Sequence, residues 1–586
     1  MLYMKVHTLA LIAAVWLFAL APGCGRSARP ITFDYDELNA RAAEEYLTPV
    51  HPGVRGSVPF WNKYSFKFTY APAFDFDTKE NAAAYVFSAT GGDTTLFFYS
   101  DSPRAALTPI WKDLPYGKIH LGVQAIDADK APLGEPQERE FTKDYPFVGP
   151  YESATDDYRA AALKAAEYIH TSPIGQLWLK TGEPDLGYGY NCYACKIWSA
   201  TIQTECFLAE HNPQLKEEAL KVARNAAAAL MKYARPQGEP LAYFPPTYFR
   251  SSTGGGVAGV LNRNQETTMF VEAVCAAKAL LDLYDITKDR QYLDFACHIA
   301  ETYRSLQSED GFWPMKVNYY TGEPTIPAPC MPTTILQLAQ RLKDQYKVKG
   351  FEDMVAKSER WLWENTLATF NFNGQFEDVD VESHAPFQDL TNCVAVDCID
   401  YLLAKPHPSQ EEIGICYEMA RFAEDQFTCW NSPLDVALGP ESKMESQPFV
   451  YEQFDFQVPV DHSTAGVAMA WLRIYQHTGD LLALAKAKAL IDSIVRVQAE
   501  NGRIPTVMFN NSPDDFGDIG ELPREVLNEL RREFCRTLGL RLECGKNVGL
   551  FLYDDDSFVT YAYDYQNEGP QPCYVHVKGG AKQIGR

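Results

Sequence analysis

The chain has 586 residues, enough for two or more domains, and its 46% of hydrophobic residues is typical of a globular protein. A formal net charge of -24 argues against a nucleic-acid partner, because phosphate contacts need basic surfaces. It leaves an anionic substrate open, since one Arg or Lys in a cleft can bind a carboxylate. The 33 Tyr, 33 Phe and 10 Trp suit both a large core and a surface on which sugar rings stack.

Residues 1–24 have the pattern of a lipoprotein-type signal peptide. Lys5 and His7 precede a short apolar run, Leu9 to Leu20, as in a secretory signal. The small residues before Cys24 resemble a bacterial lipobox, in which the cysteine carries the lipid; an ordinary cleaved signal peptide is the alternative. We expect a periplasmic or cell-surface lipoprotein of a Gram-negative bacterium, tethered to the outer membrane through Cys24. No later run is long and apolar enough to span a bilayer.

Residues 25–59 are expected to form an extended lead-in, and residues 60–150 a β-sandwich module. Short runs rich in β-formers, several of them alternating with period two, are separated by Gly, Pro and Asp. These runs are Tyr64–Tyr70, Ala84–Phe87, Thr95–Tyr99 and Lys118–Ile126. The pattern predicts an N-terminal antiparallel β-sandwich of the fibronectin type, which would brace a following domain or extend its cleft.

Residues 151–535 are predicted to be mainly α-helical. Apolar residues at three- and four-residue steps predict eleven helices, with a possible twelfth at Pro523–Phe534. The eleven are Thr155–His170, Cys195–Glu210, Pro213–Ala234, Glu266–Asp285, Arg290–Leu306, Pro332–Gln345, Phe351–Asn365, Thr391–Ala404, Gln410–Gln426, Thr464–His477 and Asp480–Ala499. Short turns alternate with long loops, which predicts antiparallel hairpins closing into an (α/α)6 toroid with the long loops at one mouth. Residues 536–586 are expected to be an extension packing on the toroid.

An internal repeat supports this architecture. The stretch from Tyr284 to Pro314 matches the stretch from Tyr475 to Pro505 without a gap. The matched pairs are Tyr284/Tyr475, Thr287/Thr478, Asp289/Asp480, Gln307/Gln498, Glu309/Glu500, Gly311/Gly502 and Pro314/Pro505. A repeated helical hairpin cannot bury its apolar face alone and therefore stacks on its neighbours.

Function is expected at the mouth, where the long loops meet the helix starts. Paired carboxylates supply acid and base for glycoside chemistry, so Glu266, Asp389 and Asp461 are the candidate catalytic carboxylates, with His462 as a tuning or relay group. Arg263 would hold a uronate carboxylate. The other candidate substrate-binding residues are Tyr190, Lys196, Trp198, Arg250, Trp313, Tyr319, Tyr320, Asp380, His384 and Asp455.

Each candidate also has a structural explanation. Asp389 and Asp461 precede helices and can serve as caps, Glu266 suits a helix dipole, and Trp313 can fill a core. We expect no cofactor and no metal, because P-loop, Rossmann, HExxH and GxSxG motifs are missing from the sequence. The Cys192/Cys195 pair lacks a second pair at zinc spacing.

The repeated hairpins, with Gly311-Phe-Trp-Pro314 and Gly502-Arg-Ile-Pro505, resemble six-hairpin glycosidases and toroidal polysaccharide lyases. The layout over about residues 60 to 520 is most similar to glycoside hydrolase family 154 of Bacteroidota-type bacteria. That resemblance implies β-glucuronidase activity and a uronate-containing carbohydrate as the partner, but it assigns no catalytic residue. The expected function is removal of a uronic acid from a complex glycan. A lyase using Tyr319, Tyr320 or His384 as base, and a glycan-binding lipoprotein without catalysis, are the alternatives. Oligomeric state is unknown.

Overall fold

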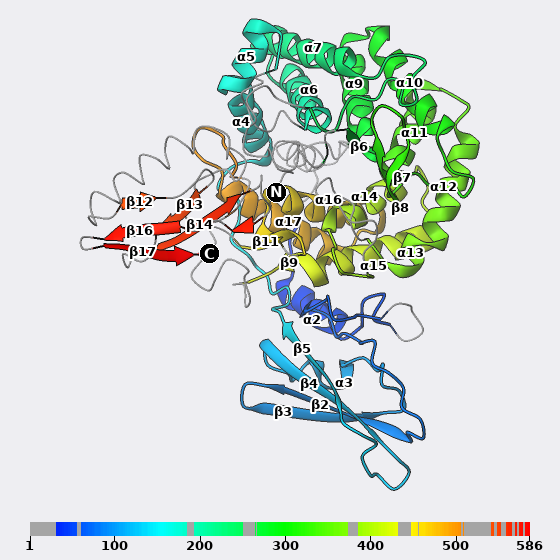
Figure 1. Ribbon diagram of the computed structural model, residues 1–586, viewed down its shortest axis with the longest axis vertical. Helices are drawn as coiled ribbons and strands as arrows, with labels where there is room; N and C mark the ends of the chain where they lie inside the picture. Colours follow the sequence, from blue (N-terminus) through cyan, green and yellow to red (C-terminus); the bar gives the residue numbers. More distant parts are fainter. Residues whose placement is uncertain are drawn as a thin grey trace.

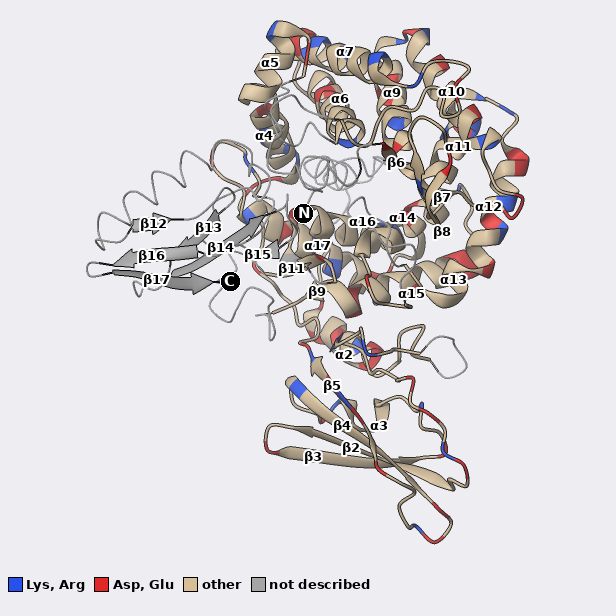
Figure 2. Cartoon of the chain, in the orientation of Figure 1, with Lys and Arg blue, Asp and Glu red and all other residues tan. Residues whose placement is uncertain are grey.

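The computed structural model describes residues 31–54, 60–184, 193–249, 264, 266–372, 385–431, 447–454, 456–505 and 508, with separate strands between 541 and 585. Within these ranges, no helix is long and apolar enough to cross a membrane. Cys24 and the predicted signal peptide lie outside the described residues, as does the predicted twelfth helix. In Figure 2, Lys and Arg are interspersed with Asp and Glu over the coloured parts of the chain.

The expected lead-in contains a helix, α2 (Tyr35–Glu45), which begins where the Asp34 carboxylate accepts a hydrogen bond from the backbone N–H of Glu37. The strands that follow form one five-stranded sheet, ordered β1-β5-β4-β2-β3. Its members are β1 (Lys67–Phe68), β2 (Ala84–Gly91), β3 (Thr94–Ser100), β4 (Gly117–Ile126) and β5 (Gln137–Lys143), and the short helix α3 (Thr108–Trp111) precedes β4.

This single sheet differs from the expected sandwich. Every pairing is antiparallel except that of β1 with β5. Phe97 and Tyr99 on the edge strand β3 are 61% and 69% exposed, so one face there meets solvent. Period-two alternation identifies strands with one buried face, but it does not say whether a second sheet or another element covers that face.

The region after residue 150 is helical and forms a ring in Figure 1. Its helices are α4 (Tyr158–Thr171), α5 (Pro173–Thr181), α6 (Ala194–His211), α7 (Lys216–Tyr233), the 3-10 turn η2 (Phe270–Glu272), α9 (Ala273–Thr287), α10 (Arg290–Ser305), α11 (Thr333–Tyr346), α12 (Glu352–Glu364), α13 (Thr366–Thr369), α14 (Asn392–Leu403), α15 (Gln410–Phe427), α16 (Asp461–Thr478) and α17 (Leu481–Arg496).

These helices make an inner and an outer row. In the described part of the chain, α6, α9, α11, α14 and α16 pack on one another in that order, and each is followed by an outer partner. Helix α6 is buried on almost every side, whereas α12 buries only Met354, Ser358 and Leu362. The outer row closes where Gln498, after α17, donates a hydrogen bond to the carbonyl of Ala161 on α4 (2.8 Å). In the described residues, five inner helices with their outer partners agree with the paired rows of the predicted toroid.

The predicted repeat is confirmed in its local structure. Asp289 and Asp480 cap α10 and α17 in the same way. Gly311 and Gly502 have φ values of 99° and 93°, a region that disfavours side chains. The side-chain amides of Gln307 and Gln498 donate to the carbonyls of these two glycines. Matching residues therefore perform matching turns after each hairpin.

Two small sheets lie beside the starts of inner helices. One is ordered β6-β7-β8, from β6 (Thr267–Met269), β7 (Pro314–Asn318) and β8 (Pro324–Pro329), and leads into α9. The other is ordered β11-β10-β9, from β9 (Thr428–Cys429), β10 (Phe449–Gln453) and β11 (Phe456–Pro459), and leads into α16. The C-terminal extension contains β12 (Arg541–Glu543), β13 (Val548–Leu552), β14 (Phe558–Asp564), β15 (Gly569–Pro570), β16 (Cys573–Val577) and β17 (Gly580–Gly585).

A buried polar cluster joins the N-terminal region to the toroid. The Glu424 carboxylate on α15 accepts hydrogen bonds from Tyr46 (2.6 Å), Tyr70 (2.8 Å) and Trp430 (2.9 Å). It also forms an ion pair with Lys486 on α17 at 2.7 Å, and both of these side chains are 0% exposed. Groups from α2, the sheet module, α15 and α17 thus meet at one carboxylate.

Candidate functional site

The starts of α6 and α9 bring a cation and a carboxylate together. Lys196, in the first turn of α6, lies with its Nζ 3.2 Å from Oε1 of Glu272, and the two side chains are 8% and 5% exposed. The Cys195 thiol donates to the backbone carbonyl of Glu272 at 3.0 Å, which ties the two helix starts together. Lys196 was predicted to bind substrate. Glu272 was missed, because it lies within an apolar run that indicates a buried helix face.

The start of α16 contributes Asp461 and His462. Asp461 is 4% exposed, and its Oδ1 accepts a hydrogen bond from the backbone N–H of His462 at 2.7 Å. Burial raises the pKa of Asp461 well above its usual range, and the nearby Glu452 carboxylate raises this pKa further. Asp461 therefore favours its protonated form. Burial, aided by the Lys196 ammonium, lowers the pKa of His462 to about 4, so its imidazole is neutral near pH 7.

Glu452 is positioned by the packing of β10 on α14. The Asn392 side-chain amide donates to the carbonyls of Tyr451 and Glu452, both at 2.8 Å. Glu452 is 3% exposed. Its negative charge raises the pKa of Asp461, so the two carboxyl groups interact electrostatically. Glu452 is not among the candidates that the sequence predicts.

A cavity of about 150 Å³ lies between α14 and α16, and His462 is one of the residues that line it. It extends from His462 along the helices past Asp397 to Asp400 and Arg473, which form an ion pair. Burial raises the pKa of Asp397 to about 7. The cavity offers groups that can hold water and exchange protons next to His462.

Together, Lys196, Glu272, Glu452, Asp461 and His462 form what we call the inner cluster. They come from α6, η2, β10 and α16, and all are buried or, for His462, half-buried. Chemically, the cluster combines a carboxyl group with a raised pKa, further carboxylates, a neutral imidazole and a cation, which are the components of general acid–base catalysis.

Two predicted stacking residues belong to the core. Trp313 is 0% exposed, and its indole N–H donates to the carbonyl of Tyr303 at 2.9 Å. Trp198 is also 0% exposed and packs against Trp178 and Phe249. Both rings are fully buried, which favours their structural explanation, and their role in substrate binding stays a prediction. Both lie where helices and loops pack tightly, and an aromatic residue at a loop end looks the same in sequence whether it faces inward or outward.

The two tyrosines in the turn after β7 also contact other parts of the protein. The Tyr319 hydroxyl donates to the carbonyls of Tyr233 (3.1 Å) and Phe244 (2.9 Å), and burial raises its pKa, which disfavours a role as base. Tyr320 is 51% exposed and lies over the Arg235 guanidinium.

Glu266 is exposed on the turn before β6, and Asp389 is half-buried on the turn before α14. Their catalytic roles stay predictions.

The remaining predicted residues lie outside the described residues. They are Tyr190, Arg250, Arg263, Asp380, His384 and Asp455. In the ranges that are described, no three His, Cys, Asp or Glu side chains gather in a way that could hold a metal ion.

No family model matches the chain, and no curated protein matches its sequence. It is similar in structure to a cellobiose 2-epimerase from Spirochaeta thermophila (15% identity, 61% of this chain and 91% of that chain, TM-score 0.40). A family 76 glycoside hydrolase from a bovine Bacteroides thetaiotaomicron strain (11%, 77% and 92%, TM-score 0.34) and a sugar epimerase from a ruminal bacterium (13%, 56% and 85%, TM-score 0.35) are also similar. Because these similarities are weak, we infer function from the site alone.

Proposed function

We propose that the chain is a glycan-processing enzyme. More specifically, we propose a glycoside hydrolase that removes a uronic acid from a complex glycan, with glucuronate as the uronic acid to test first. The observation that carries the proposal is the raised pKa of Asp461, at the start of inner helix α16, together with a second buried carboxylate, Glu452, on β10. Glycosidases need one carboxyl group that is protonated near neutral pH and a second that is ionised.

In this mechanism, Asp461 protonates the leaving glycosidic oxygen. Glu452 then activates a water molecule or attacks the sugar as a nucleophile, which replaces the predicted pairing of Asp461 with Glu266 or Asp389. The neutral His462 imidazole relays the proton that the reaction releases. Lys196 supplies positive charge toward the uronate carboxylate, and we expect Arg250 and Arg263 to add to it from the neighbouring loops.

A lyase remains a second candidate because of one specific observation. The lowered pKa of His462, about 4, keeps its imidazole unprotonated near neutral pH, so a ring nitrogen has a lone pair that can accept the proton next to a uronate carboxylate; the same low pKa makes it a weak base. This would replace Tyr319, Tyr320 and His384 as the predicted base. Lysis leaves an unsaturated product that absorbs in the near ultraviolet, whereas hydrolysis does not.

The test is incubation of the purified chain with glucuronoxylan, hyaluronan, alginate and polygalacturonate, followed by chromatography and ultraviolet absorbance. Release of a saturated uronic acid supports the hydrolase. Asp461→Asn should then lower kcat about 100- to 10,000-fold, the usual contribution of a general acid. The matched control is Asp289→Asn, which alters an exposed helix cap on the outer row and should leave activity unchanged.

Other outcomes decide against the hydrolase. A rise in absorbance, lost in His462→Ala, would make the chain a lyase. No product from any of these glycans would favour the glycan-binding lipoprotein. The lipid anchor has its own test: fatty-acid labelling of the expressed chain, which Cys24→Ser should abolish.

A further inference from the structure

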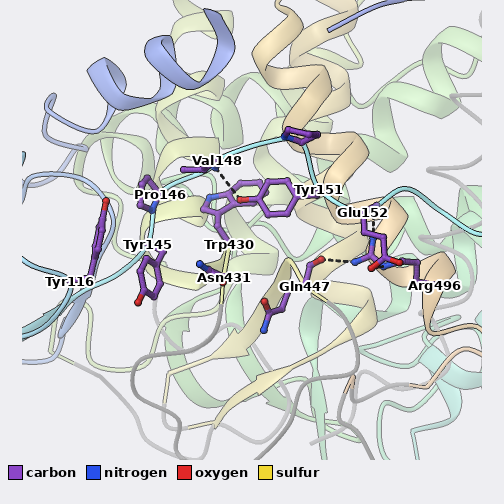
Figure 3. A pocket seen from close by; sticks show the side chains of 11 residues that line it. Tyr116, Tyr145, Pro146, Val148, Tyr151, Glu152, Trp430, Asn431, Gln447 and Arg496 are labelled. Carbon is purple, nitrogen blue, oxygen red and sulfur yellow. Dashed lines mark hydrogen bonds and ion pairs between the residues drawn. The ribbon is translucent and has the colours of Figure 1, made fainter. Parts of the chain in front are cut away.

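A second, larger pocket lies away from the inner cluster, where the sheet module, the segment after it and the toroid meet (Figure 3). Its volume is about 620 Å³, within the roughly 300–1,000 Å³ usual for small-molecule sites. Its lining comes from the β3–β4 region, from residues 145–152, from the β9–β10 region and from the end of α17. No function has been assigned to it above.

One side of this pocket is a pair of tyrosine rings. Tyr116 and Tyr145 have their ring centroids 4.7 Å apart, and Tyr116 is 47% exposed. The Lys143 ammonium lies 4.8 Å from the centre of the Tyr116 ring and donates hydrogen bonds to the carbonyls of Trp111 (2.5 Å) and Leu114 (2.6 Å). The Lys143 cation and the Tyr145 ring both pack against Tyr116 and help to fix its ring, and the exposed part of Tyr116 is what a ligand could contact.

The other side is polar and balanced in charge. The Arg496 guanidinium donates to the backbone carbonyls of Glu152 and Gln447, the latter at 2.6 Å, and its Nε lies 3.7 Å from the Glu152 carboxylate. Figure 3 shows this pair across the pocket from Tyr116, with Trp430, Asn431 and Gln447 between the two sides. Because the charges of Arg496 and Glu152 balance, this side of the pocket does not favour binding of a phosphate or another strong anion.

We propose that this pocket, defined by Tyr116, Tyr145, Asn431, Gln447 and Arg496, is a second glycan-binding site. A sugar ring would stack on Tyr116, and its hydroxyl groups would exchange hydrogen bonds with the amides of Asn431 and Gln447 and with the Glu152 carboxylate. An aromatic platform opposite a few polar side chains suits a ligand that has both apolar ring faces and many hydroxyls.

The position of the pocket fits a chain-like ligand. Helices α16 and α17 are joined by a short turn and are therefore antiparallel, so the end of α17, with Arg496, lies at the same face as the start of α16, with Asp461. A glycan bound to this pocket would lie on the face that carries the inner cluster. The binding proposal itself does not depend on Asp461 being the catalytic acid.

The test uses calorimetric titration of the whole chain carrying Asp461→Asn, which slows turnover if Asp461 is the catalytic acid. The probes are xylohexaose, α-1,6-mannohexaose, cellohexaose and hexagalacturonate. We expect at least one of them to bind, and Tyr116→Ala to weaken that binding about tenfold, as for truncation of an aromatic anchor. Tyr116→Phe should retain the affinity, because it keeps the ring. Tyr99→Ala is the matched control, since it removes another exposed tyrosine of the same sheet outside the pocket.

Two results would overturn the proposal: no binding of any hexasaccharide, or binding that Tyr116→Ala leaves unchanged. Loss of binding in Tyr99→Ala as well would indicate a general effect on the module instead of this pocket. Activity assays report separately on the proposed function, because a catalytically inactive chain that still binds through Tyr116 would refute only the hydrolase mechanism.

Discussion

Replacing Lys486 by methionine is expected to destabilise the junction between the N-terminal region and the toroid. Methionine keeps most of the aliphatic stem, so the change removes mainly the charge. Lys486 and Glu424 are both 0% exposed, with Nζ 2.7 Å from Oε2. Breaking a buried pair by removing one partner typically costs about 3–5 kcal/mol, because the other charge stays buried.

The structure favours the lower end of that range. In Lys486→Met, the Glu424 carboxylate retains hydrogen bonds from Tyr46, Tyr70 and Trp430, at 2.6, 2.8 and 2.9 Å. Hydrogen bonds to a charged group are worth about 1.5–3 kcal/mol each, so these donors limit the penalty. We expect a loss of about 3 kcal/mol in the free energy of unfolding.

Denaturation in guanidinium chloride, followed by tryptophan fluorescence, measures this loss. Adding Glu424→Gln to Lys486→Met removes the unpaired charge, so the double variant should be more stable than Lys486→Met alone. The surface pair of Lys232 and Glu183, with side chains 56% and 57% exposed, provides the control: Lys232→Met should leave the free energy of unfolding almost unchanged. If the losses of stability from Lys486→Met and Glu424→Gln simply add in the double variant, the two buried charges do not stabilise each other.

Two further predictions concern the repeat and the inner cluster. Gly311→Ala and Gly502→Ala should each lower the free energy of unfolding by about 1–3 kcal/mol, because a Cβ would lie 2.4 and 2.2 Å from a backbone carbonyl oxygen at a positive φ. Gly414→Ala, within a helix and in open space, should instead stabilise by up to about 1 kcal/mol; equal losses at all three positions in thermal denaturation would contradict this explanation. Lys196→Met should raise the pKa of His462 above its value of about 4, since it removes a nearby positive charge, and NMR titration of the labelled imidazole would show an unchanged or lower pKa if the two groups do not interact.

Much of the helical architecture could be predicted from periodicity and loop length. The starts of α10 and α17 were predictable because Asp289 and Asp480 cap them, and the glycine turns followed from the repeat. The single sheet could not be predicted, since strand alternation reports one buried face without naming what covers it. Helix α2 lies in a segment expected to be extended, although Asp34 at its start is an N-cap residue.

The candidate site also has one part that the sequence predicts and another that only the structure shows. The sequence alone determined that a polar pair, Asp461 and His462, precedes an apolar helix predicted from Thr464 to His477, and this pattern suffices to mark a helix start at the mouth. The structure begins the helix at Asp461 itself. Only the tertiary structure decided which groups meet there. Glu272 comes into contact with Lys196 because α6 packs on α9, and Glu452 approaches Asp461 because Asn392 holds β10. The pKa values that give these groups their proposed roles arise from burial and from neighbours distant in the chain, which no local pattern contains.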